Sequence, residues 1–85
     1  MKLKKNFVTH ISGDDQVLVD TTSSFAGLIR NNKTAAFIVE NLKEETTKEH
    51  IIDLMEAKYD APREVIEKDV SGIIDTLRSV GALDE

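Results

Sequence analysis

Hydrophobic and polar positions follow two different periods along this chain, and the change between them falls near residue 32. Before it, apolar residues come in short β-branched or aromatic groups. Residues 7–11 alternate as a strand should, residues 16–20 do so again, and the turn formers at 13–15 predict a hairpin between them. A polar connection then leads to a third predicted strand over residues 25–31.

Beyond residue 32 the period becomes helical, and capping signals divide the segment into three predicted helices. Asn32 is a good N-cap for the first, and Thr46 with Glu49 matches a capping box for the second. Pro62 fits the first turn of the third helix, and Gly81 suits the left-handed position that ends it. The apolar stripes of the three helices are Ala35, Ile38, Val39 and Leu42; Ile51, Met55 and Tyr59, flanked by Ile52 and Leu54; and Ile66, Val70, Ile73, Ile74, Leu77 and Val80.

Strands followed by helices predict an α+β fold. We expect a small three-stranded antiparallel sheet followed by a three-helix bundle, in the order βββααα. The 85 residues are enough for one domain, residues 1–85, and leave no room for a second.

Charge is unevenly spread and disfavours nucleic acid as a partner. The net charge is −5, from 11 basic and 16 acidic residues, and the acids are concentrated after residue 33. Binding to nucleic-acid phosphate needs lysine and arginine side chains. The negative charge of the region after residue 33 would instead repel phosphate. The longest apolar run, residues 35–39, is far too short to span a membrane. With no cysteine and no signal-peptide pattern, we expect a cytoplasmic protein.

No constellation of catalytic or metal-binding residues is present in the sequence. His10 and His50 have no second histidine and no cysteine at ligand spacing, which argues against zinc. Asp14 and Asp15 lie in no EF-hand pattern, so a turn is the better interpretation. We therefore expect no enzyme activity, no catalytic residue, no metal and no cofactor.

Four segments, in order, resemble a known family. They are FVTHISGDDQVLVD, FAGLIRNNKTAAFIVENL, TTKEHIIDLMEAKYD and EKDVSGIIDTLRSVGALDE, which together span residues 7–84. Their order and spacing are similar to those of the PqqD-like proteins, named for a component of pyrroloquinoline quinone (PQQ) biosynthesis and also called RiPP recognition elements. One position departs from the family pattern, because Asn31 stands where the family usually has leucine. This change either loosens the junction of strand and helix or marks a different ligand.

The resemblance implies a winged-helix-like domain that binds the leader segment of a precursor peptide and presents it to a modifying enzyme, such as a radical S-adenosylmethionine enzyme or a peptidase. The leader would add as a strand beside residues 28–31 and lie in a groove walled by the third helix. Ile74 and Arg78 form the opposite flank of that helix, and the sequence leaves open which flank faces the sheet. The residues expected to bind the peptide are Leu28, Ile29, Arg30, Asn31, Asp69, Ile73 and Thr76.

Each of these residues also has a purely structural interpretation. Leu28 and Ile29 fit an ordinary strand core, Arg30 fits an exposed surface, and Asp69 fits a solvated or capping carboxylate. For the whole chain, two alternative functions stay open. One is a winged-helix DNA-binding regulator, which the acidic third helix disfavours. The other is a structural dimerisation domain, with a homodimer formed by strand exchange through residues 20–25.

Overall fold

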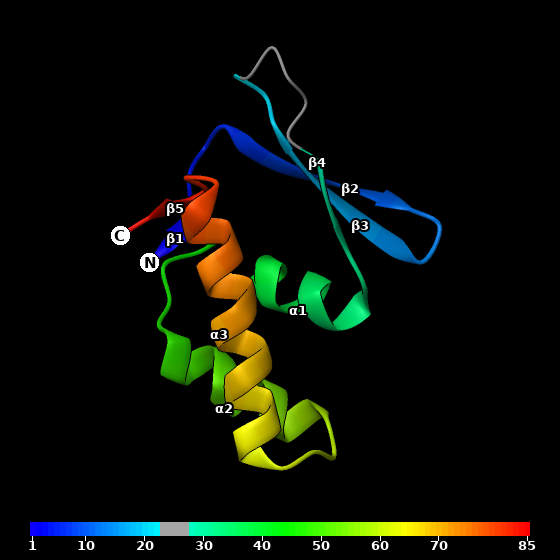
Figure 1. The fold of residues 1–85 in the computed structure, drawn as a ribbon, viewed down its shortest axis with the longest axis vertical. Helices are drawn as coiled ribbons and strands as arrows, with labels where there is room; N and C mark the ends of the chain where they lie inside the picture. The colour runs from blue at the N-terminus through cyan, green and yellow to red at the C-terminus, as the bar shows by residue number, and fades with distance from the viewer. Residues whose placement is uncertain (23–27) are drawn as a thin grey trace.

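The computed structural model describes residues 1–22 and 28–85, the side chain of Leu28 excepted. Three strands come before three helices, which confirms the predicted α+β order βββααα (Figure 1). Two further strands of two residues each, one near either end of the chain, were not predicted. The elements are β1 (Lys2–Leu3), β2 (Phe7–Ser12), β3 (Asp15–Asp20), β4 (Leu28–Asn31), α1 (Lys33–Asn41), α2 (Lys48–Lys58), α3 (Arg63–Ser79) and β5 (Leu83–Asp84).

The main sheet is antiparallel, in the order β2-β3-β4. The predicted hairpin turns at Gly13, whose φ of 63° is a conformation that glycine adopts without strain. Within the described residues β4 pairs with β3 on one side and with no strand on the other, so it is an edge strand. The first part of the predicted third strand, residues 25–27, lies outside the described residues.

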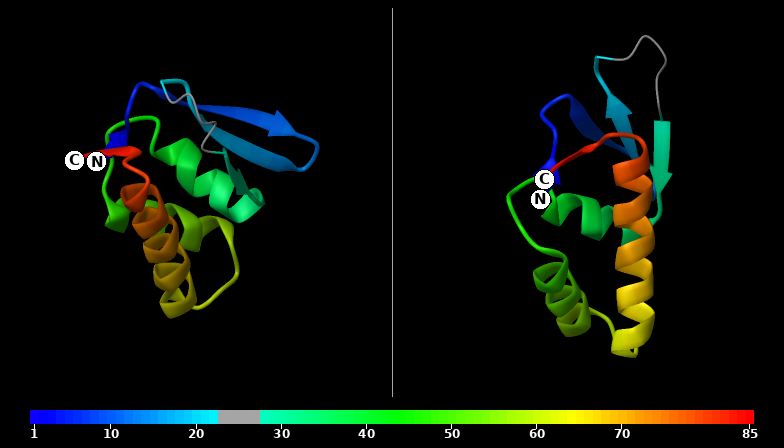
Figure 2. Two further views of the ribbon diagram at one scale, coloured as in Figure 1. Left: turned by 45° about the horizontal axis from the view of Figure 1, so that its top comes forward. Right: turned by 60° about the vertical axis from the view of Figure 1, so that its left-hand side comes forward.

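Helix α1 packs against this sheet, and α3 packs against both α1 and α2 (Figure 1). Leu18 on β3 is fully buried and belongs to one core cluster with residues of all three helices. Ile11 is on the β2 face that the sequence predicts to be apolar, yet it is 74% exposed. The reason is its place near the hairpin tip, which extends past the beginning of α1 (Figures 1 and 2). No helix in the described part of the chain has the length and apolarity needed to cross a bilayer.

The helix starts agree with the sequence in one case and differ in two. Asn32 caps α1 as predicted, since its side chain accepts a hydrogen bond of 2.9 Å from the Ala35 amide. Pro62 is the N-cap of α3, one residue before the predicted first turn. The predicted Thr46 cap of α2 is wrong: the cap is Thr47, whose Oγ1 accepts a bond of 3.1 Å from the His50 amide.

Pairing with the N-terminal residue explains the shift from Thr46 to Thr47. The Thr46 amide donates to the Met1 carbonyl at 3.0 Å, and the Thr46 carbonyl accepts from the terminal amine at 2.9 Å. These bonds occupy the Thr46 backbone, so the helix begins after Thr47 and its third residue is His50. Glu49 is then in the wrong position to complete a capping box.

The end of α3 forms a Schellman motif around Gly81, whose φ is 73°. The Gly81 amide donates to the Arg78 carbonyl at 3.1 Å, and the Ala82 amide donates to the Leu77 carbonyl at 2.9 Å. The left-handed position predicted for Gly81 is therefore confirmed. Val80 was predicted to extend the apolar stripe, which is wrong: it is the C-cap, beyond the last helical turn, and is 48% exposed.

The two ends of the chain form a small sheet of their own, in which β1 pairs with β5 and Leu3 lies opposite Leu83. The Leu3 amide also donates to the Leu42 carbonyl at 2.7 Å, which joins this sheet to the end of α1. Both termini consequently lie side by side (Figures 1 and 2). Arg78 adds a bidentate pair with Glu85, at 2.8 and 2.9 Å, which lowers the pKa of that exposed carboxyl.

Candidate functional site

A groove runs between the open edge at β4 and the helix α3. It consists of two adjoining hollows of about 260 and 220 Å³, which share Asn32, Ala35 and Ile73. We call it the β4–α3 groove. Its lining residues are Ile29, Arg30, Asn31, Asn32, Thr34, Ala35, Asp69, Ile73, Thr76 and Leu77.

The strand side of the groove combines an apolar residue, a buried amide and an exposed cation. Because side chains alternate along a strand, Ile29 and Asn31 share one face and Arg30 is on the other. Ile29 is half-buried against the core cluster, and Asn31 is only 4% exposed. The Arg30 side chain is 71% exposed, and its Nε lies 3.3 Å from Asp15 Oδ2 on the neighbouring strand.

The helix side of the groove is the flank of α3 that carries Asp69, Ile73 and Thr76. Ile73 is half-buried against the core, whereas Asp69 and Thr76 are exposed. On the opposite flank Ile74 is 3% exposed within the core and Arg78 pairs with Glu85. The structure therefore places one flank of α3 along the groove, which the sequence had left open.

Six of the seven residues predicted to bind a peptide line this one groove, and the seventh, Leu28, contributes its backbone to the same edge strand. Their role in binding stays a prediction. The sequence interpretation missed four lining residues: Asn32, Thr34, Ala35 and Leu77. Three of them lie in the Asn-Lys-Thr-Ala segment that begins α1, and this motif was the available signal.

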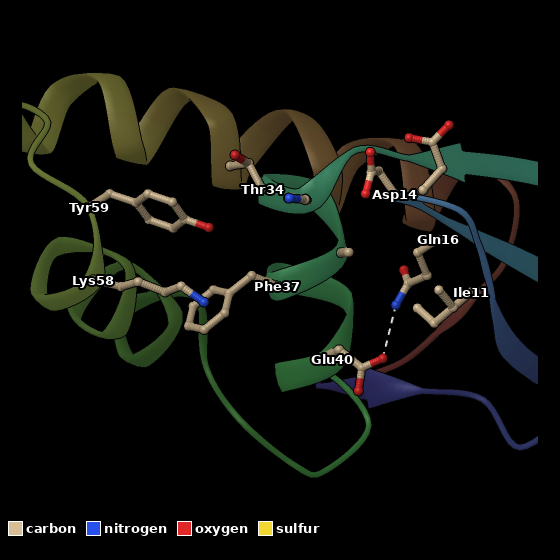
Figure 3. A pocket seen from close by; sticks show the side chains of 11 residues that line it. Ile11, Asp14, Gln16, Thr34, Phe37, Glu40, Lys58 and Tyr59 are labelled. Atoms are coloured by element: carbon tan, nitrogen blue, oxygen red, sulfur yellow. Dashed lines mark hydrogen bonds between the residues drawn. The ribbon is translucent and has the colours of Figure 1, made fainter.

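A second missed feature lies beneath the strand side of the groove. Asn31 Nδ2 donates to Gln16 Oε1 at 3.0 Å. Gln16 Nε2 in turn donates to Glu40 Oε1 at 2.9 Å, the bond drawn as a dashed line in Figure 3. Asn31 therefore does not loosen the junction of strand and helix, since it is buried and hydrogen-bonded there. Alternation along β3 was the available signal, because it places Gln16 on the same inward face as Leu18.

A larger hollow of about 620 Å³ lies between the hairpin tip, α1 and the end of α2, and the sequence analysis did not predict it (Figure 3). The rings of Phe37 and Tyr59 meet edge to face there, with centroids 6.2 Å apart. Lys58 Nζ lies 4.3 Å from the Phe37 centroid, a cation–π distance. Among the described residues, this hollow included, no group of three or more His, Cys, Asp or Glu side chains is placed to hold a metal ion.

Comparison with known proteins places the chain in a family and agrees with its fold. The model of the family described as coenzyme PQQ synthesis protein D (PqqD) matches residues 15–83. The chain belongs to the PqqD family. A search of curated proteins gave no match.

Two solved structures share the fold of this PqqD-family chain. One is TbiB1 in complex with the TbiA(beta) leader peptide, with 23% sequence identity over 99% of this chain and 95% of that chain, and a TM-score of 0.83. The other is a lasso peptide synthetase B1 complexed with its leader peptide, with 22% identity over 95% and 93% of the two chains and a TM-score of 0.75.

Proposed function

We propose that this PqqD-family chain is a non-catalytic adaptor that binds the leader segment of a ribosomally made precursor peptide. The leader adds as a strand beside β4 and lies in the β4–α3 groove. The observation that carries the proposal is the open edge of β4 beside that groove. An edge strand offers unpaired N–H and C=O groups to an extended chain, and adjacent pockets select its side chains.

The lining of the groove fits a peptide that has both apolar and charged side chains. Ile29, Ile73 and Leu77 offer apolar surface to a leader side chain. Among the described residues Arg30 pairs only through Nε, with Asp15, so its other N–H donors can serve a leader carboxylate. Asp69, exposed on the other side of the groove, suits a leader cation.

Family membership and the two solved relatives support the same function. Both relatives share this fold, and each of those structures holds a leader peptide. We propose that the chain presents its bound precursor to a modifying enzyme, such as a radical S-adenosylmethionine enzyme or a peptidase. The product is PQQ or another ribosomally derived peptide product.

The charges on α3 weigh against the alternative of a DNA-binding regulator. Arg63 lies within 3.4 Å of carboxylates on Glu49, Asp53, Glu56 and Glu67. The hydrogen bonds that its guanidinium donates to Asp53 and Glu56 raise its pKa. A helix whose arginines are paired with acids presents little positive charge to phosphate. Pairing of β4 with a second copy would instead compete with the peptide for one edge, so dimer and peptide complex would exclude each other.

The test uses the leader half of a short peptide encoded beside this gene, titrated into ¹⁵N-labelled protein. We expect chemical-shift changes at residues 28–35 and 69–77, and saturable binding by calorimetry. Thr76→Arg fills the groove from an exposed position and should weaken binding by about tenfold or more, or roughly 1.4 kcal/mol. Val65→Arg, at an α3 residue that is 49% exposed and outside the groove, is the matched control. Equal affinities of the two variants would contradict the proposed site.

A further inference from the structure

Two polar side chains are buried among the described residues, and they are neighbours. Gln16 is 1% exposed and Asn31 is 4% exposed. They lie directly opposite each other in the register of β3 and β4. A buried amide is costly unless its N–H and C=O groups are hydrogen-bonded, so the direction of each bond in this pair matters.

The carboxylate of Glu40 fixes that direction. It can only accept hydrogen bonds, and Lys43 Nζ holds its Oε1 at 2.9 Å. Gln16 must therefore turn its NH₂ group towards Glu40, and this turns Gln16 Oε1 towards Asn31. Asn31 must in turn donate from Nδ2. We call this chain of two bonds the Asn31–Gln16–Glu40 relay.

The relay uses Asn31 Nδ2 as its donor and leaves the other polar atom of that side chain, the acceptor Oδ1, unused. No group in the described part of the chain donates a hydrogen bond to it, and Asn31 lines the β4–α3 groove. Asn31 Oδ1 is not among the fully buried atoms that lack a hydrogen-bond partner, so it keeps some contact with solvent in the free protein. A ligand that covers this oxygen with an aliphatic side chain removes that contact and leaves a buried acceptor unpaired, which is costly, whereas a ligand that brings a donor avoids the cost.

We infer that Asn31 determines specificity: it selects leader peptides with a hydrogen-bond donor, such as a hydroxyl, amide or cationic side chain, at the position facing it. This inference rests on the proposed function. Sites built to hydrogen-bond a ligand group reject analogues that lack it, because the buried polar group is left unpaired. Glu40 acts as a positioning residue, since it does not touch the ligand and influences it only through Gln16 and Asn31.

Glu40 offers a test that leaves the groove itself intact. Glu40 lines the larger hollow between the hairpin tip, α1 and the end of α2 (Figure 3), and it does not line the β4–α3 groove. In Glu40→Gln the new amide can donate as well as accept, so the relay can run in either direction. Reversal would present the Asn31 NH₂ group, a donor, to the ligand. The preference for ligand donors should then be lost, and acidic side chains should become acceptable.

The experiment is selection of a displayed, fully randomised peptide library on immobilised wild-type protein, Asn31→Leu and Glu40→Gln. At one peptide position we expect wild type to enrich donors over aliphatic residues by about tenfold, equivalent to roughly 1.4 kcal/mol. Asn31→Leu should enrich aliphatic residues at that position. In Glu40→Gln, the enrichment of donor side chains and of acceptor side chains should agree within about threefold. Thermal melts check that each variant is folded, and Glu40→Gln, at an exposed side chain, remains informative should Asn31→Leu unfold.

The outcomes separate this inference from the proposed function. If wild type enriches peptides but with the same side-chain preferences as both variants, the role of Asn31 is overturned and the adaptor function stands. If wild type enriches no peptide at all, the proposed function fails and this inference fails with it.

Discussion

At the scale of single residues, Gly72 and Gly81 are subject to opposite backbone demands. Gly72 lies inside α3, where glycine loses more conformational entropy on folding than any other residue. Gly81 has a φ of 73° in the turn that ends the helix. A Cβ added at either position meets no atom within 4 Å, so substitution by alanine changes backbone energetics and not packing.

We expect Gly81→Ala to lower the free energy of unfolding by about 1–2 kcal/mol, the cost of the left-handed conformation for a residue with a Cβ. Gly72→Ala should raise it by about 0.5–1 kcal/mol, from helix propensity. Urea denaturation of both variants beside wild type measures the two changes. Changes of the same sign in the free energies of unfolding of the two variants would contradict the Schellman motif at Gly81.

Capping signals predicted Gly81, and the resemblance to the PqqD-like proteins implied six of the ten residues that line the groove. Neither predicted the relay. Gln16 and Asn31 become partners only through the β3–β4 register, and Glu40 joins them only through the way α1 packs under the sheet. A single sequence records neither relation.

At the scale of elements, the beginning of α2 is decided by tertiary contact. Thr46 and Thr47 are equally good caps by type, and Glu49 favours Thr46. Hydrogen bonds with Met1, one donated and one accepted, occupy the Thr46 backbone instead. Thr46 Oγ1 is buried without a partner among the described residues. Of the two neighbours, only Thr47 uses its hydroxyl to stabilise the helix.

Replacing each threonine by valine, which has nearly the same shape, should therefore give opposite results. Thr47→Val loses the cap and should reduce the free energy of unfolding by about 1 kcal/mol. Thr46→Val removes an unsatisfied buried hydroxyl and should leave stability unchanged or raise it by up to about 1–3 kcal/mol. Thermal unfolding followed by circular dichroism distinguishes the two. A larger loss of stability in Thr46→Val than in Thr47→Val would contradict this assignment and support a capping box of Thr46 and Glu49.

At the scale of the whole molecule, the order of strands and helices could be predicted, but the closing of the two ends could not. A strand of two residues has no detectable period, so β1 and β5 leave no pattern in the sequence. Their leucines are nevertheless core residues, with Leu3 8% and Leu83 7% exposed. The terminal sheet joins the first residues, the end of α1 and the end of α3 into one cluster.

Leu3→Ala and Leu83→Ala should each cost about 2 kcal/mol or more of unfolding free energy. Because the two face each other across β1 and β5, the double variant should lose at least about 0.5 kcal/mol less than the sum. Leu3→Ala combined with Ile66→Val, near the far end of α3, is the control and should be additive. Additivity of the leucine pair would show that the terminal strands are not coupled.

The shortness of β4 bears on how long a peptide stays bound. Alternate residues of an edge strand direct their N–H and C=O groups outward, so the four residues of β4 offer about four main-chain hydrogen bonds. At roughly 0.5–1.5 kcal/mol each, these total about 2–6 kcal/mol, no more than the cost of association itself. Residence time is then governed by the side chains in the groove. On the proposed function, once an enzyme removes or alters that part of the peptide, the remainder should dissociate quickly, and one adaptor molecule could then serve many precursors in succession.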